Sequence, residues 1–263
     1  MSLALIAVLA FLGVFGGFSA GLLGFGGGVL MFPLLYYVPP LLGMVALDVK
    51  TVAALVVTQV FFSTVVAGVA HFRSKRVQWR IALAAGVISA VGAFSGGVAS
   101  SWVSERFLLL LFAIVTLLVV LMMFLPSPTE EQEKIPVDRV TVALFPLSLC
   151  SSVAGVVVGF LGAGNFIFVP LLIYIMKMPT RIAIACSLFI AMMNTTLGFL
   201  GKLVMGQIPF ALALAVVIGS ILGAVAGEKI HGRLSPPVLR HIYAAMIGGI
   251  GIRVWMTLLG LDP

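Results

Sequence analysis

The sequence predicts an all-α membrane protein built from two related halves, and three observations lead to this fold class. Of the 263 residues, 62% are hydrophobic and 9% are charged, whereas soluble domains have about 45–50% apolar and about 25% charged residues. Long apolar segments recur along the chain, most of them near the length of about 20 residues that crosses a bilayer as a helix. An internal repeat relates the two halves. We therefore expect a lipid bilayer around the chain.

Each half contains five apolar segments, which we expect to be helices because lipid offers no hydrogen-bond partners to the backbone. Their ranges are 3–23, 28–46, 49–70, 78–100 and 106–125 in the first half, and 140–161, 165–178, 181–203, 208–228 and 236–259 in the second. No basic region precedes the first segment, so we expect it to be retained rather than removed as a signal peptide. A polar stretch separates the halves. The predicted organisation is a first membrane repeat over 1–126, a cytoplasmic linker over 127–139 and a second membrane repeat over 140–263.

The halves align with each other but differ in where their basic residues fall. Residues 50–96 match 181–227 without a gap, and Pro33-Leu-Leu matches Pro170-Leu-Leu. Positive charge marks cytoplasmic loops. In the first half, basic residues follow the third segment, whereas the second half has only Lys202 at the matching place. In the second half, basic residues follow the fourth segment instead. The residues concerned are His71, Arg73, Lys75, Arg76 and Arg80, and Lys229, His231, Arg233 and Arg240. Matching loops then lie on opposite sides, which predicts two inverted-topology repeats.

Glycines interrupt the apolar run between the first two segments of each half. The first half reads Gly24-Phe25-Gly26-Gly27-Gly28, and the second reads Gly162-Ala163-Gly164-Asn165. Each glycine costs about 1 kcal/mol relative to alanine inside a helix, so we expect broken or re-entrant first helices. Two interpretations stay open at this point. The helix starts could present amide groups and a positive dipole end to an anion, or the glycines could be tight helix-packing points.

Polar side chains in the third segments are the other candidates for a binding site. Gln59, Asn194 and Thr195 carry amides or hydroxyls that can donate hydrogen bonds to an anion without the cost of a buried charge. Bonds between helices are the alternative role. No Asp or Glu lies in the middle of an apolar segment, which argues against a proton relay through carboxylates. We expect Lys50 and Arg181 to reach the membrane interface, and Arg253 either to do the same or to face a polar cavity.

The two glycine segments, extended to Pro33 and Pro170, resemble the signature segments of the sulfite exporter TauE/SafE family. The resemblance extends over essentially the whole chain. It implies transport of small sulfur-containing anions or organosulfonates, such as sulfite, sulfoacetate or taurine-related compounds, across a bacterial or archaeal inner membrane. Ala163 and Asn165 stand where the first half has Gly26 and Gly28, so the two halves of the site are expected to differ chemically.

Together these observations predict a secondary transporter that moves a small sulfur-containing anion by alternating access. The predicted substrate-binding residues are Gly24, Phe25, Gly26, Gly27, Gly28, Gln59, Gly162, Gly164, Asn165, Asn194 and Thr195. A passive anion channel and a membrane-embedded enzyme are the alternatives, although the chain lacks a His-Glu-x-x-His or Gly-x-Ser-x-Gly motif. We expect no cofactor, no metal and no nucleic-acid partner, and we expect Cys150 and Cys186 to be packing residues. The sequence leaves open whether the protein forms a homodimer.

Overall fold

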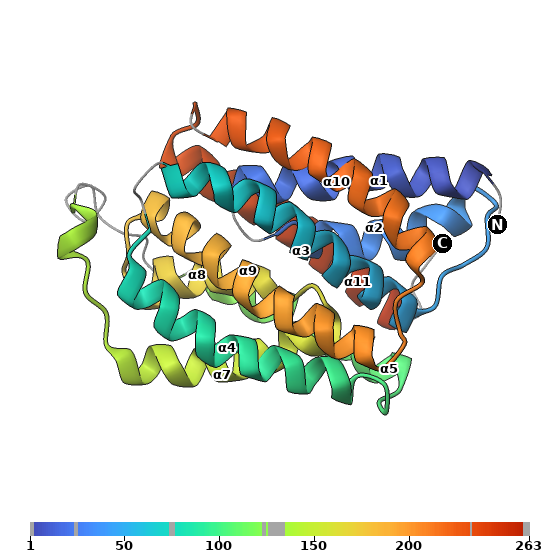
Figure 1. Cartoon of the computed structure of the whole chain (residues 1–263), viewed down its shortest axis with the longest axis horizontal. Helices are drawn as coiled ribbons and strands as arrows, with labels where there is room; N and C mark the ends of the chain where they lie inside the picture. Colours follow the sequence, from blue (N-terminus) through green and yellow to red (C-terminus); the bar gives the residue numbers. More distant parts are fainter. Residues whose placement is uncertain are drawn as a thin grey trace.

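Helices make up all the regular structure in the described part of the chain. The computed structural model describes residues 3–23, 26–73, 77–122, 125, 135–231 and 233–259, and most helices in these ranges run along the long axis of the molecule (Figure 1). In chain order the elements are α1 (Leu3–Leu23), α2 (Gly28–Leu41), α3 (Val49–Arg73), α4 (Trp79–Ala99), α5 (Glu105–Met122), the 3-10 turn η1 (Val137–Arg139), α7 (Leu144–Leu161), the 3-10 turn η2 (Gly164–Ile167), α8 (Phe168–Pro170), the π-helix η3 (Leu171–Ile175), α9 (Thr180–Val204), α10 (Phe210–His231) and α11 (Pro236–Leu258).

The predicted all-α membrane fold is confirmed. Seven of the described helices are long and apolar enough to cross a membrane, namely α1, α3, α4, α5, α7, α9 and α10. Large apolar side chains such as Phe11, Val91, Phe145 and Leu222 are exposed on their outer faces. In water such a surface would drive aggregation, whereas in a bilayer it faces lipid tails.

Two of the predicted segments are shorter than expected. We predicted 28–46 and 165–178, but α2 ends at Leu41, and the second segment breaks up into a 3-10 turn, one α-helical turn and a π-helix that ends at Ile175. Gly43, with a φ of +69°, ends α2 in a Schellman cap, because the N–H groups of Gly43 and Met44 bind the carbonyl oxygens of Pro40 and Pro39. The apolar helix over Gly164–Ile175 is about 18 Å long at 1.5 Å per residue. It therefore cannot span a hydrocarbon core of about 30 Å.

Other boundaries differ from the prediction at the basic segments. We placed His71, Arg73 and His231 in loops, but α3 continues to Arg73 and α10 continues to His231. The prediction of loop positions for these residues is therefore wrong. Of the predicted linker, residues 127–134 lie outside the described residues, and residues 137–139 form η1. The domain boundaries stay a prediction.

The two halves are interleaved rather than set side by side, because helices of one half pack on helices of the other. α1 packs along α10 and α4 packs along α7, while α3 lies against α9 and α10. Glycines allow the backbones of α1 and α10, and those of α4 and α7, to approach closely. A Cβ atom on Gly223 would lie 2.0 Å from the carbonyl oxygen of Val14, and one on Gly155 would lie 2.2 Å from that of Ser89. Both contacts leave no room for any larger residue.

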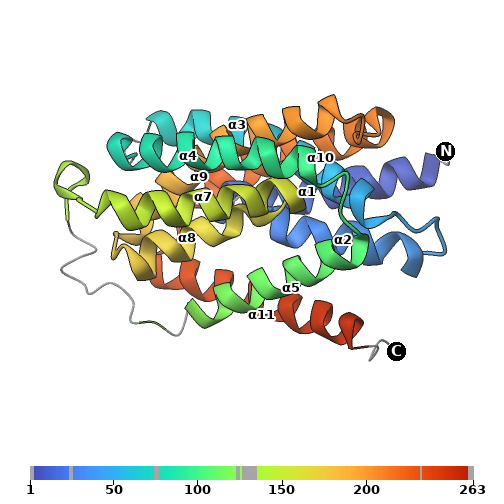
Figure 2. The same ribbon diagram turned by 90° about the horizontal axis from the view of Figure 1, so that it is seen from below.

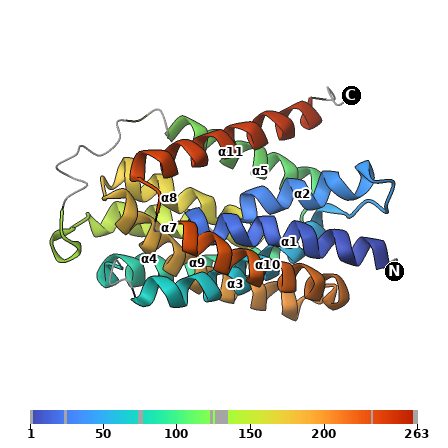
Figure 3. The same ribbon diagram turned by 90° about the horizontal axis from the view of Figure 1, so that it is seen from above.

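Chain direction also differs between the halves. α1 begins at the end of the molecule where the N label stands, whereas α7 begins at the opposite end (Figure 2). The carboxyl-terminal ends of α3 and α10 both lie at the end where α7 begins (Figure 1). The two basic segments therefore share one end of the molecule. α11 ends on the same side as the start of α1 (Figure 3).

Substituting Gly223 with alanine tests the importance of the close α1–α10 contact. We expect Gly223→Ala to lower the free energy of unfolding by about 2–3 kcal/mol, because the new methyl group overlaps a carbonyl oxygen of α1. Gly248 on α11 is the matched control, since no atom lies within 4 Å of its Cβ position. Gly248→Ala should leave stability unchanged or raise it by up to about 1 kcal/mol through helix propensity. Thermal unfolding in detergent measures both, and equal effects would contradict the assignment.

Candidate functional site

Both predicted interruptions are present. α1 ends at Leu23 and α2 begins at Gly28, after Gly26 and Gly27 with φ angles of +79° and +74°. Gly24 and Phe25, which belong to the predicted site, lie outside the described residues. α7 ends at Leu161, and Gly162 follows with a φ of +68°. Glycine adopts these left-handed conformations without steric cost. The glycines therefore end the helices at the two places where the sequence predicts breaks.

The two interruptions lie against each other. A Cβ atom on Gly28 would be only 2.9 Å from the Cα atom of Ala163. The α2 helix and the segment containing α8 lie nearly in line, with their starts toward one another at mid-length of the molecule (Figures 2 and 3). Neither start has a side-chain cap, because the residues before them are Gly27 and Ala163. Backbone N–H groups of the first turn therefore have no partner within their own helices.

Helix α3 forms the support for both interruptions. Val60 of α3 faces Gly26 and Gly28, and a Cβ atom on Gly162 would lie 2.2 Å from the carbonyl oxygen of Ala53. The Gln59 Nε2 atom donates to the carbonyl oxygen of Gly26 over 3.2 Å. Packing and hydrogen bonding in the middle of α3 thus hold the two breaks in place. The Nε2 atom of Gln59 therefore has a structural role, since it bonds α3 to the first break.

Several amide atoms, at the second break and on helices α3 and α9, are buried without a partner. Asn165, in η2, is 1% exposed and Asn194, in α9, is 0% exposed. Neither side chain has a hydrogen-bond partner at its oxygen or nitrogen among the described residues, and the Oε1 atom of Gln59 has none either. Each unsatisfied group costs about 1–3 kcal/mol. Buried polar atoms are normally paired with protein or water, so these residues have capacity for an additional polar molecule.

The remaining predicted residues are used in the structure itself. Thr195 is buried, and its hydroxyl donates to the carbonyl oxygen of Ala191 one turn earlier in α9. Gly164 packs against Val158 of α7, where a Cβ atom would lie 3.0 Å from its backbone. The structure therefore gathers Gly26, Gly27, Gly28 and Gln59 around the first break and Gly162, Gly164 and Asn165 around the second.

Sequence reasoning missed Lys202. We assigned it to a loop, but it is 0% exposed in the last turn of α9, so that expectation is wrong. The Nζ atom lies 2.8 Å from Ser100 Oγ, 3.2 Å from Gln207 Oε1 and 3.4 Å from the carbonyl oxygen of Phe160. One signal was available in the sequence, because the apolar run continues past Lys202 to Met205.

Lys50 and Arg181, which we expect at the membrane interface, each bind a backbone carbonyl group. The Lys50 Nζ atom donates to the carbonyl oxygen of Ser101 over 2.8 Å, and an Arg181 nitrogen donates to that of Leu234 over 2.9 Å. Ser101 lies just beyond α4, and Leu234 lies just beyond α10. Each cation therefore binds the carbonyl group that follows a neighbouring helix. Lys50 is only half-buried, so its position is not fully enclosed.

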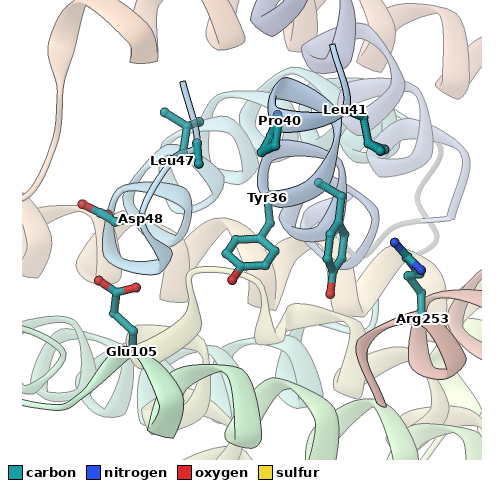
Figure 4. A pocket seen from close by; sticks show the side chains of 9 residues that line it. Tyr36, Pro40, Leu41, Leu47, Asp48, Glu105 and Arg253 are labelled. Carbon is teal, nitrogen blue, oxygen red and sulfur yellow. The ribbon is translucent and has the colours of Figure 1, made fainter. Parts of the chain in front are cut away.

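A separate cavity of about 630 Å³ lies between the carboxyl-terminal part of α2 and helices α5 and α11 (Figure 4). The guanidinium carbon of Arg253 is 5.2 Å from the centroid of the Tyr37 ring. Arg253 therefore faces this cavity, and its placement at the membrane interface stays a prediction. The residues lining it are Tyr36, Tyr37, Pro40, Leu41, Ala46, Leu47, Asp48, Glu105 and Arg253. It lies away from the helix interruptions, at the other end of α2.

Comparison with known proteins places the chain in a family. Residues 9–254 match the model described as Sulfite exporter TauE/SafE. A probable membrane transporter protein of Methanocaldococcus jannaschii is 26% identical over 260 residues, with 95% of each chain covered. One from Xylella fastidiosa is 30% identical over 258 residues, with 92% of this chain and 93% of the relative covered. A third, the probable membrane transporter protein YunE of Bacillus subtilis, is 24% identical and covers 94% of this chain and 96% of its own length.

No solved structure matches the chain. The apolar helices, the match over nearly the full length and the transporter relatives from bacteria and an archaeon agree with one another. The protein is a multi-pass membrane transporter, and it belongs to the sulfite exporter TauE/SafE family.

Proposed function

We propose that this transporter is a secondary carrier that moves a small sulfur-containing anion, such as sulfite, a sulfonate or an organosulfonate, across the inner membrane by alternating access. The observation that carries the proposal is the meeting of two uncapped helix starts at mid-length of the molecule. Paired broken helices of this kind form the substrate site in many secondary transporters.

Electrostatics at this position favour an anion. Each helix start carries roughly half a positive charge from the aligned peptide dipoles, and its first N–H groups point out of the helix. Asn165 and Asn194 add amide groups that can donate to oxygen atoms. Among the described residues no Asp or Glu is buried. Sulfite and sulfonates each offer three acceptor oxygens on sulfur, which suit such a set of donors.

The proposed binding residues are the predicted ones, Gly24, Phe25, Gly26, Gly27, Gly28, Gln59, Gly162, Gly164, Asn165, Asn194 and Thr195. Glycine at the breaks lets a ligand approach the backbone closely. The two sides of the site are not equivalent, because Asn165 provides an amide where the first half has Gly28. We infer that the first break contributes backbone donors and the second contributes backbone and side-chain donors.

Several features support the inverted repeat that alternating access would use. α1 and α7, the first helices of the halves, begin at opposite ends of the molecule. Exchange of the halves converts the α1–α10 pair into the α7–α4 pair, and both pairs are present. It also converts the bond from Lys50 to Ser101 into the bond from Arg181 to Leu234. The two basic segments lie at one end, which agrees with a shared cytoplasmic side.

Purified protein in liposomes tests the proposed function directly. We expect radiolabelled sulfite to enter with saturable kinetics, and we expect unlabelled sulfite or methanesulfonate on the far side to accelerate entry. Trans-stimulation of this kind separates a carrier from a channel. Folded protein that moves none of several sulfur anions would contradict the proposal, and flux that never saturates would favour the passive anion channel.

The two buried asparagines give a prediction that separates binding from stability. Asn165→Leu and Asn194→Leu remove amide atoms that have no protein partner, so we expect the free energy of unfolding to stay the same or to rise by about 1 kcal/mol. The KM for transport should rise at least tenfold. Ser151→Ala is the matched control, because the Ser151 hydroxyl is also buried without a partner but lies about 15 Å before the end of α7. Uptake titrations and thermal unfolding give both readouts.

The geometry of the first break can be tested at Gly27. Its φ is +74°, and a Cβ atom there would lie 1.8 Å from the carbonyl oxygen of Gly16. We expect Gly27→Ala to displace the start of α2 and to reduce uptake more than tenfold. Gly43→Ala bears a similar backbone cost, since Gly43 has a φ of +69°, but nothing lies within 4 Å of its Cβ position. Uptake in this control should stay within twofold of the original protein.

A further inference from the structure

Lys202 is the only charged side chain among the fully buried residues that the structure describes. Its three hydrogen-bond acceptors are a serine hydroxyl, a glutamine amide oxygen and a backbone carbonyl oxygen, all of them uncharged. No described carboxylate lies within hydrogen-bond or ion-pair distance of its Nζ atom. A buried ammonium without a counter-charge is costly, so its surroundings call for an explanation.

Helix ends explain how the ammonium is held. Phe160 lies in the last turn of α7, and Ser100 directly follows α4. The carboxyl-terminal end of a helix carries roughly half a negative charge and favours cations. Two such ends converge on Lys202, and Gln207 adds its amide oxygen from the segment before α10. These partial charges stabilise the ammonium but supply no full counter-charge.

The ammonium lies close to the second helix interruption. Phe160, whose carbonyl oxygen contacts Lys202, stands two residues before Gly162. Along α9, Lys202 follows Thr195 by seven residues, which is two turns. Residues at this spacing share one face of a helix and lie about 10 Å apart. Lys202 is thus connected to the proposed site both through the end of α7 and along α9.

An anion at the second break faces an electrostatic difficulty. The break offers the amide-rich start of the segment beginning at Gly164, but it also offers the carbonyl-rich end of α7, which repels negative charge. Lys202 offsets this repulsion, because its ammonium group contacts a carbonyl oxygen of that end. We propose that Lys202, as an ammonium, provides the positive charge that holds the anion at the paired helix starts, so that binding strengthens with the charge of the anion. This inference rests on the proposed function.

The expected size of the effect follows if the anion lies about 10 Å from Lys202, which is the spacing between Lys202 and Thr195 along α9. Two unit charges about 10 Å apart in a protein with an effective dielectric constant of about 20 change a binding constant roughly tenfold. A dianion should gain about twice as much on the logarithmic scale. Removal of the Lys202 charge should therefore weaken a monoanion about tenfold and a dianion about a hundredfold. A purely structural role would weaken both by the same factor.

Two substitutions test this charge, one by removing it and one by pairing it with a carboxylate. Lys202→Met deletes the ammonium group, whereas Gln207→Glu keeps the lysine and places a carboxylate where the amide oxygen now lies 3.2 Å from Nζ. Gln207→Glu is nearly isosteric, and its new ion pair compensates the buried charge, so it provides a test even if Lys202→Met fails to fold. Arg253→Met is the control, because it removes one positive charge from the cavity at the far end of α2.

The measurement is competition by methanesulfonate, with one negative charge, and sulfoacetate, with two, against uptake of radiolabelled sulfite into liposomes. In both test variants we expect the ratio of inhibition constants to shift about tenfold against sulfoacetate, and in Arg253→Met we expect no shift. An unchanged ratio in Gln207→Glu would overturn the role of Lys202 and leave the proposed function intact. Absence of sulfur-anion uptake in the original protein would instead overturn the proposed function.

Discussion

The structure depends on how two interrupted helices pack against each other at mid-length of the molecule. A backbone that leaves helical geometry at this depth exposes N–H and carbonyl groups that lipid cannot bind. Here each break is covered by protein, because Gly28 lies against Ala163 and the middle of α3 packs on both. The carbonyl oxygen of Gly26 accepts hydrogen bonds from Gln59 and Ser63. The amides of Asn165 and Asn194 are left without partners among the described residues, and they carry the functional interpretation.

This arrangement trades stability for binding capacity. The amides of Asn165 and Asn194 could be replaced by apolar groups of similar shape with little loss of packing, yet the chain keeps them buried and without partners. The same holds for the ammonium of Lys202, which lies among uncharged acceptors. These three groups concentrate on η2 and α9, in the second half. The first break, in contrast, is built from glycine backbone and α3 side chains.

Much of the fold could be predicted because its main determinants are local. Apolar length fixed the helices, and consecutive glycines marked both interruptions before any contact was known. The burial of Lys202 could not be predicted, since it depends on the ends of α4 and α7 converging from distant parts of the chain. Arg253 was ambiguous for the same reason, because its cavity is formed by α2 and α5. The early end of α2 was predictable in principle from Gly43, which closes the helix in a left-handed conformation.

The close contacts between glycine and carbonyl groups restrict how such a molecule can change shape. At Gly223 the backbones of α1 and α10 interlock so tightly that sliding one helix past the other would drive Cα atoms into carbonyl oxygens, and Gly155 does the same for α7 and α4. Each of these pairs joins one helix from either half of the sequence. The rigid bodies of a conformational cycle would then not be the two halves of the gene product. They would be two mixed blocks, and α9 would move with α4 and α7, because it packs on α4 as extensively as α7 does.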